Sequence, residues 1–246
     1  MNKKVVVVYS GGLDSTVLLT KCKREFDEVL ALNFSYGSKH NWNERRAARY
    51  VAKKLGVSLY EYDIPVNVEE RHPDNSLPRA VDFLKSDLLK SGGTIPESIY
   101  DKKSMKSTVV PFRNGIMLAL AAGFAESRGF TSIAIANHAG DHTIYPDCRP
   151  KFIFNCAQSI YEGTDGRVML YTPFTELTKG KIVALGLTLM APLEDTWSCY
   201  KGETVHCGKC GTCIERIAAF KENGLIDPRA YKIDIDWTGC VEWYPE

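Results

Sequence analysis

Residues 5–16 read VVVVYSGGLDST, and this stretch carries the clearest signal of the fold class. Its first part, Val5–Tyr9, is a β-branched run of strand length, which is typical of a strand buried on both faces. Behind the two glycines, residues 15–26 place four apolar side chains on one helical face: Val17, Leu18, Cys22 and Phe26. A buried strand that passes through a glycine turn into an amphipathic helix predicts the first unit of a parallel α/β sheet.

The same alternation of strand and helix continues along the chain. We expect strands at 29–34, 59–64, 132–136 and 168–171, and helices that end at Gly56 or cover 114–127, 152–161, 179–189 and 214–222. Uninterrupted apolar strands between helices predict a Rossmann-like, three-layer α/β/α architecture with a mostly parallel sheet.

Two stretches interrupt the alternation. Residues 65–108 are too long for a plain connection, so we expect a flap-like insertion with one helix marked by Val81, Leu84 and Leu88. Strand signals end near residue 194. The sequence therefore predicts a main domain over 1–193 and a small C-terminal appendage over 194–246.

Composition narrows the class of protein. The chain has 246 residues, 44% of them hydrophobic and 25% charged, as in ordinary globular domains. A formal net charge of +1 argues against a globally basic nucleic-acid binder and leaves only a local basic patch open. The apolar stretch Gly115–Ala125 is too short to cross a bilayer and the N-terminus lacks a signal-peptide layout, so we expect a cytoplasmic protein away from the membrane. The tryptophans Trp237 and Trp243 predict a tail that docks on the body or on a second subunit.

The turn Ser10–Thr16 joins the first strand to the first helix. Ligands of open parallel sheets bind beyond the carboxyl ends of the strands, where a helix N-terminus offers unpaired N–H groups to an anion. Adjacent glycines let the backbone form a nest of amides, and three hydroxyls add donors. The turn lacks the Lys of a Walker A loop, so it predicts a pyrophosphate site with Asp14 free to approach Mg²⁺. A tight turn with Asp14 or Ser15 as the helix N-cap is the structural alternative.

Half of the eight cysteines gather in one short stretch: Cys199, Cys207, Cys210 and Cys213. Interleaved glycines allow sharp turns and four thiolates leave no open coordination position, so the pattern predicts a structural Zn²⁺ site. Iron–sulfur ligation, buried thiols and a nucleic-acid-binding zinc ribbon are the alternatives. His206 is expected as a surface residue or a replacement ligand. The remaining cysteines are scattered, which favours a metal site in a reducing compartment over a disulfide scaffold.

Four motifs stand out: SGGLDST at 10–16, VPFRN at 110–114, YPDCR at 145–149, and SCYKG followed by CGKCGTCIER within 198–216. Together they resemble the 7-cyano-7-deazaguanine (preQ0) synthase family over nearly the whole chain. The first motif is shared with the wider PP-loop (N-type) ATP pyrophosphatases, whereas the last two are far more specific.

The resemblance implies a function. It implies an adenine-nucleotide α-hydrolase-like fold, the cofactors ATP, Mg²⁺ and Zn²⁺, and a homodimer. The implied reaction converts 7-carboxy-7-deazaguanine and ammonia into the nitrile on the route to queuosine, releasing AMP and pyrophosphate. An acyl adenylate would form first, ammonia would displace AMP, and a second adenylation on the amide oxygen would allow elimination to the nitrile.

The resemblance also implies site residues. ATP is expected to bind Tyr9, Ser10, Gly11, Gly12, Leu13, Asp14, Ser15 and Thr16. The expected catalytic residues are Asp14 as a Mg²⁺ ligand, with Arg113 and Lys179 as cations near the phosphates or the substrate carboxylate. The expected substrate contacts are Asp141, Asp147, Arg149, and Tyr145 or Phe112 stacked on the base. A surface charge is the alternative for each cation, and a core position for each aromatic residue.

The chain departs from the family pattern at Ser38, at Lys39 and over 142–144, where we expect the substrate to sit. These departures leave open a relative that stops at the amide or transfers the activated deazaguanine to a macromolecule. Two further classes stay open. A tRNA thiolation enzyme predicts a basic extension and a reactive cysteine, and a nucleotide- or zinc-binding adaptor predicts no pyrophosphate release.

Overall fold

The computed structural model describes residues 3–65, 67–70, 79–82, 84–97, 103 and 105–243, with only the backbone of 67–70 and 79–82. At its centre lies a five-stranded sheet made of β1 (Lys4–Val8), β2 (Glu28–Ser35), β3 (Ser58–Asp63), β6 (Ser132–Ala134) and β7 (Met169–Tyr171). All neighbouring strands are parallel, in the order β3-β2-β1-β6-β7. The predicted parallel sheet is confirmed.

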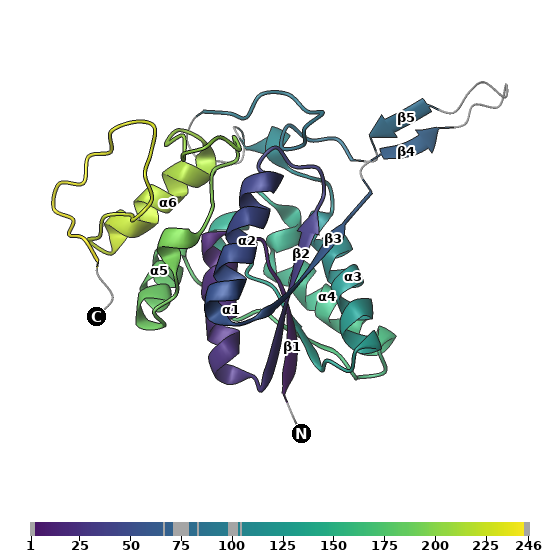
Figure 1. The fold of residues 1–246 in the computed structure, drawn as a ribbon. Coiled ribbons are helices and arrows are strands. Elements are labelled where there is room, and N and C mark those ends of the chain that lie inside the picture. Colours follow the sequence, from purple (N-terminus) through teal and green to yellow (C-terminus); the bar gives the residue numbers. More distant parts are fainter. Residues whose placement is uncertain are drawn as a thin grey trace.

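Helices cover both faces of this sheet (Figure 1). One face carries α1 (Leu13–Glu25), α2 (Asn41–Leu55) and α5 (Lys179–Thr188), and α6 (Gly211–Glu222) packs on α5. The other face carries α3 (Arg113–Ser127) and α4 (Pro150–Gly163). Because side chains alternate along a strand, Val5 and Val7 of β1 join the cluster under α1 while Val6 joins the cluster under α3. This is the predicted three-layer architecture.

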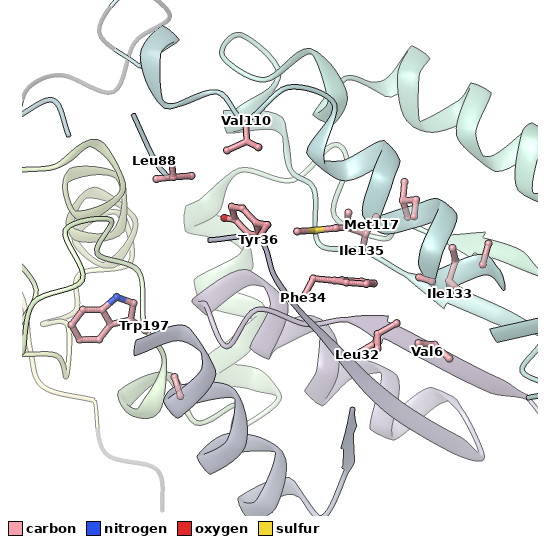
Figure 2. Packing of buried hydrophobic residues seen from close by; sticks show 14 of the residues in the cluster. Val6, Leu32, Phe34, Tyr36, Leu88, Val110, Met117, Ile133, Ile135 and Trp197 are labelled. Carbon is pink, nitrogen blue, oxygen red and sulfur yellow. The ribbon is translucent and has the colours of Figure 1, made fainter. Parts of the chain in front are cut away.

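The second face is packed by apolar side chains from the sheet and from α3. Figure 2 shows Val6, Leu32 and Phe34 of the sheet together with Met117 of α3, and all four side chains are buried. Tyr36 and Trp197 belong to the same cluster, so the core continues from the sheet toward the C-terminal segment.

The end of α2 follows from its sequence. Ala47, Ala48, Val51 and Ala52 are buried along one face of the helix. Gly56 then adopts the left-handed conformation with φ of 63°, and its N–H donates to the carbonyls of Ala52 and Lys53. Glycine adopts this conformation without a steric penalty, so the predicted stop at Gly56 is confirmed.

The expected helix inside residues 65–108 is wrong. Val81 lies in β5 (Arg79–Asp82), which pairs antiparallel with β4 (Asn67–Glu70), and Figure 1 shows this ribbon extending away from the sheet. Residues 84–97 form turns and bends, and Leu88 and Leu89 are buried in the core. The helical spacing of Val81, Leu84 and Leu88 therefore runs across a strand and a segment of turns, and Leu88 with Leu89 attaches that segment to the body. Residues 66, 71–78, 83, 98–102 and 104 of the expected flap lie outside the described residues.

One described segment, Lys106–Ser127, passes a length and composition test for crossing a membrane. Half of its most apolar window is buried inside the protein, and α3 within it packs on β1 and β6. The segment is therefore a core helix.

The C-terminal tail packs on its own chain. The N–H of Val241 donates to the carbonyl of Gly224, and the N–H of Ile226 donates to the carbonyl of Val241. Trp237 packs on the cluster that includes Phe220 of α6. The expected docking of the tail on the body is confirmed for this tryptophan.

Candidate active site

A cavity opens at the carboxyl ends of β1, β2 and β6, with about 1060 Å³ of empty volume that includes its open mouth. Parallel α/β sheets bind their ligands at this edge. The lining residues come from the loops after these three strands, from the first turns of α2 and α3, and from the C-terminal segment. Three of the expected catalytic side chains line it together: Asp14, Arg113 and Lys179.

The loop between β1 and α1 forms one wall of the cavity. The N–H of Gly12 donates to Ser10 Oγ at 3.1 Å, and Ser10 Oγ lies 3.0 Å from Ser15 Oγ. Gly11 has φ of 85°, and a Cβ there would lie 2.6 Å from the Glu44 carbonyl of α2. Both facts require glycine at this position. The alternative of a side-chain N-cap fails, because Gly12 occupies the N-cap and no side chain accepts a capping hydrogen bond.

The predicted loop residues divide into two groups. Six line the cavity: Tyr9, Ser10, Gly12, Leu13, Asp14 and Ser15. Gly11 and Thr16 do not. The Thr16 side chain is fully buried, and its hydroxyl lies 3.2 Å from the Tyr9 hydroxyl, where it supports the loop from behind.

A charged cluster lies beside this loop. Lys179 Nζ is 3.1 Å from Asp14 Oδ2 and donates to Glu215 Oε2 at 2.7 Å. His138 Nδ1 accepts from the N–H of Gly140, while its Nε2 lies 3.4 Å from Asp141 Oδ2 and 3.8 Å from Asp14 Oδ2. Three carboxylates therefore surround one lysine and one histidine.

The protonation states in this cluster follow from burial and charge. Burial alone would raise the pKa of Asp14, but Lys179 and then His138 lower it, and the pKa ends below its ordinary value. Burial would lower the pKa of Lys179, but Asp14 and Glu215 raise it above its ordinary value. The lysine therefore keeps its charge beside the loop between β1 and α1. Asp14 Oδ1 is buried without a hydrogen-bond partner, so it could hold a cation.

A metal ion fits near the same residues. Ligand atoms of His138, Asp141 and Glu215 lie within 4.8 Å of one another. Carboxylate oxygens suit Mg²⁺, which keeps most of its waters and takes one or two carboxylates together with substrate phosphates. Asp141 and Glu215, together with His138, are therefore the candidate ligands, and the buried, unpartnered Asp14 Oδ1 is a further one.

Arg113 is the first residue of α3, and its side chain lines the cavity. Its Nη1 donates to the Tyr36 hydroxyl at 3.2 Å, and its guanidinium carbon is 5.5 Å from the centre of the Tyr36 ring. The tyrosine fixes one side of the guanidinium, and the planar fork can still bind a carboxylate or phosphate.

The expected substrate contacts are only partly brought to the cavity. Asp141 lines it, whereas Tyr145, Asp147, Arg149 and Phe112 do not. Asp147 Oδ2 accepts from the N–H of Asn114 at 2.9 Å, so this carboxylate caps the start of α3. Arg149 is exposed and donates to the carbonyl of His142. Phe112 is 61% exposed and packs edge-on against Phe152.

Tyr145 lies just behind the wall of the cavity. It is buried in a small cluster with Met105, Ile144 and Cys148, and its hydroxyl is 3.3 Å from that of Tyr200, which does line the cavity. The core alternative therefore describes its position.

The residues at which the chain departs from the family pattern lie outside the lining of this cavity. Lys39 Nζ donates to the carbonyls of Asp87 and Gly92 and thereby holds residues 84–97 on the body. Ser38 is fully buried and pairs with Leu89. Neither these residues nor 142–144 line the cavity.

Several lining residues were missed from the sequence: Tyr36, Glu44, His138, Tyr200 and Glu215. Two of them follow from the rule that already located the phosphate loop, because Tyr36 and His138 come shortly after β2 and β6. Glu215 lies within the CGKCGTCIER motif, whose pattern indicates the cysteine cluster and not the cavity.

The four clustered cysteines lie close enough together to hold one metal ion. Their sulfur atoms all lie within 4.8 Å of one another, with Cys210 to Cys213 at 3.4 Å and Cys207 to Cys213 at 3.9 Å. Tetrahedral Zn²⁺ with Zn–S bonds of about 2.3 Å needs sulfurs about 3.8 Å apart. The N–H groups of Lys209 and Cys210 point at the Cys207 sulfur. An iron–sulfur cluster would insert its own atoms and spread the thiolates farther, so the geometry favours zinc.

His206 is neither a metal ligand nor a surface residue. Its side chain is fully buried, stacks on Trp197 at 4.4 Å between ring centres, and accepts from the N–H of Ser198 at 3.0 Å. Arg216 is also fully buried, in a bidentate pair with Asp227. The segment therefore offers less basic surface than its sequence suggests, which disfavours a nucleic-acid-binding ribbon.

Known proteins match this chain over most of its length. A model of the family described as Queuosine biosynthesis protein QueC matches residues 4–224. A 7-cyano-7-deazaguanine synthase of Porphyromonas gingivalis (strain ATCC 33277) is 47% identical over 230 residues, which cover 94% of this chain and 98% of that protein. One from Desulfotalea psychrophila is 42% identical over 228 residues, which cover 93% and 98%.

Among solved structures, a predicted subunit of tRNA methyltransferase from Methanocaldococcus jannaschii is similar over 70% of this chain and 67% of that one. With 14% identity and a TM-score of 0.39, this similarity is too weak to indicate a shared function. The family match and the near-complete coverage of both relatives show that the chain belongs to the QueC family of queuosine biosynthesis proteins.

Proposed function

We propose that this chain, which as a QueC-family member is an ATP-dependent 7-cyano-7-deazaguanine synthase, makes the nitrile by adenylating first the acid and then the amide. The observation that carries the proposal is the single cavity that holds the amide-rich loop, the Asp14–Lys179–Glu215 cluster and Arg113. An anion site and a separate guanidinium in one cavity suit two acidic substrates that must meet.

In the proposed reaction the loop amides and hydroxyls of Ser10 to Ser15 bind the β- and γ-phosphates of ATP. Lys179 offsets the negative charge of the departing pyrophosphate. Arg113 binds the carboxylate of 7-carboxy-7-deazaguanine and directs one oxygen at the α-phosphorus. Mg²⁺, held by Asp14 with Asp141, would stabilise charge on the phosphates when bound.

The order of bonds follows from leaving-group chemistry. The carboxylate oxygen attacks the α-phosphorus and pyrophosphate leaves. Ammonia then attacks the acyl carbon, AMP leaves and a proton is lost to give the amide. The amide oxygen then attacks the α-phosphorus of a second ATP and a second pyrophosphate leaves. Loss of AMP and of the two N–H protons from this adenylated amide gives the C≡N bond. Each nitrile therefore costs two ATP, and both steps use the same phosphate site.

The experiment is a product analysis of the wild-type protein with ATP, Mg²⁺, ammonia and 7-carboxy-7-deazaguanine. We expect the nitrile, with two AMP and two pyrophosphates per nitrile. Amide with one AMP would identify an enzyme that stops early, and ADP in place of AMP would refute the proposal. Lys179→Met should lower pyrophosphate release at least roughly 100-fold, by analogy with the loss of one transition-state donor. Lys181→Met, an exposed position on the same helix, is the matched control.

The competing classes find less support. A tRNA thiolation enzyme needs a reactive thiol, but burial raises the pKa of Cys148, and burial also raises the pKa of Cys156. None of the eight cysteines, all of which lie in the described part of the chain, forms a disulfide. This is typical of a reducing compartment, so we propose that the enzyme is cytoplasmic. A homodimer remains part of the proposal. A light-scattering mass of one chain would reject it.

A further inference from the structure

A further set of polar side chains lines the same cavity around the first turn of α2. The set consists of Tyr36, His40, Glu44 and Tyr200. The His40 side chain is 2% exposed and the Glu44 side chain 17%. A carboxylate this deep in a protein needs hydrogen-bond donors, because burial without them is costly.

The protein supplies little for the Glu44 carboxylate. His40 Nε2 lies 3.4 Å from Glu44 Oε1. Across the described part of the chain, no other nitrogen of Lys, Arg or His lies within 4.0 Å of this carboxylate. Its remaining acceptor positions are therefore available to a ligand in the cavity that Glu44 lines.

The neighbouring rings form flat walls for such a ligand. The His40 ring stacks on Tyr200 with 5.1 Å between centres and 30° between planes. The third ring, that of Tyr36, accepts a hydrogen bond from Arg113 on its hydroxyl, and the Arg113 guanidinium lies near its face. Burial raises the pKa of Tyr36, Arg113 lowers it and Glu44 raises it, so a positive and a negative group both lie close to this phenol. A flat ring that carries a carboxylate at one end and N–H donors at the other could place its carboxylate at Arg113 and its donors at Glu44.

We infer that Glu44 recognises the N1–H and 2-amino donors of a guanine-type base, with His40 positioning the carboxylate; this inference rests on the proposed function. A carboxylate offers two acceptors side by side, which pair with two adjacent donors. Adenine presents an acceptor at N1 beside its amino group, so Glu44 would bind it with only one hydrogen bond. The same contact therefore separates the substrate base from the base of ATP.

The test compares two ligands on two proteins by calorimetric titration and by steady-state kinetics. The ligands are 7-carboxy-7-deazaguanine and its analogue without the 2-amino group. The proteins are the wild type and Glu44→Gln, which keeps the shape of the side chain but replaces one acceptor by a donor. We expect Glu44→Gln to bind the acid roughly 10- to 100-fold more weakly, as for one lost bidentate base contact. The KM for ATP should stay unchanged.

The wild type should also prefer the acid over the analogue by roughly 10-fold or more, and Glu44→Gln should lose this preference. A merely structural role for Glu44 would weaken both ligands equally and leave the preference intact, which would overturn the inference. Glu61→Gln, the loss of a carboxylate that pairs with Arg49 on the surface, is the control for charge and should change neither ligand.

The two proposals fail in different ways. If the wild type binds the acid selectively but forms no AMP, the recognition by Glu44 stands and the proposed reaction falls. If AMP and nitrile form but Glu44→Gln discriminates like the wild type, the reaction stands and the inference falls. If the wild type binds neither ligand, both are wrong.

Discussion

Replacement of Gly11 by alanine tests the geometry of the phosphate loop more directly than any change of a charged residue. Gly11 has φ of 85°, and a Cβ built there would lie 2.6 Å from both Ala48 N and the Glu44 carbonyl oxygen. Both atoms belong to the backbone of α2, so neither can rotate away. The carbonyl of Gly11 also accepts a hydrogen bond from the N–H of Trp197 at 3.0 Å, so the loop cannot move away from α2 without breaking this bond.

The expected loss of stability has two parts. A left-handed backbone costs a residue with a Cβ about 1–2 kcal/mol. Insertion of a methyl group into a packed contact costs about 1–3 kcal/mol. Gly11→Ala should therefore lower the free energy of unfolding by about 2–5 kcal/mol, a large share of the roughly 5–15 kcal/mol of a typical domain. Denaturant unfolding with fitted midpoint and slope measures this change.

Alanine substitutions at two other glycines distinguish the backbone cost from the packing cost. Gly129 has φ of 71° with no atom within 4 Å of a Cβ, so Gly129→Ala should show only the backbone cost of about 1–2 kcal/mol. Gly123 lies inside α3 with no atom within 4 Å, so Gly123→Ala should stabilise the protein by up to about 1 kcal/mol. If Gly11→Ala costs no more than Gly129→Ala, the close packing of the loop on α2 is refuted.

Two further predictions concern the C-terminal segment. Asp227→Asn should cost roughly 3–5 kcal/mol of unfolding free energy, because it leaves the fully buried Arg216 without its carboxylate. Burial raises the pKa of Asp227, but Arg216 and Tyr231 lower it below its ordinary value. The pair therefore stabilises the fold above about pH 4 and loses this contribution as the pH falls, so acid titration should destabilise the wild type more steeply than the variant. Removal of zinc by a chelator should lower the Tm and abolish ATP binding together; an unchanged fold that binds ATP but has no activity would contradict a structural role.

The centre of the sheet was predictable because β1 and most of β2 are apolar runs that are buried on both faces, as in a parallel sheet under helices, whereas β3 at the edge is mostly exposed. The turns of residues 84–97 were not predictable, because apolar residues at helical spacing also occur in a loop whose side chains are buried against the body. Leu88 and Leu89 are buried by contacts with the body, and Lys39 fixes the same segment through backbone carbonyls. Those contacts join parts of the chain almost fifty residues apart.

The site was predictable where chemistry and strand ends coincide. The loop after β1 and the cysteine cluster each carry a local pattern whose geometry needs no distant partner. Asp147 carries no such pattern, and only its contact with the backbone of Asn114, 33 residues away, shows that its carboxylate caps a helix. Glu44 is the reverse case, since nothing local marks its side chain as part of a cavity.

The C-terminal segment completes the site. Trp197, Ser198, Tyr200, Thr212 and Glu215 all line the cavity, and all lie beyond the boundary proposed near residue 193. Glu215 sits two residues after Cys213 on α6, and it accepts a hydrogen bond from Lys179 of α5. A metal that fixes Cys210 and Cys213 at the start of α6 therefore also fixes the carboxylate that holds Lys179 beside the phosphate loop. Zinc bound by these cysteines would therefore support catalysis by holding Glu215 and Lys179 in place, without touching a substrate.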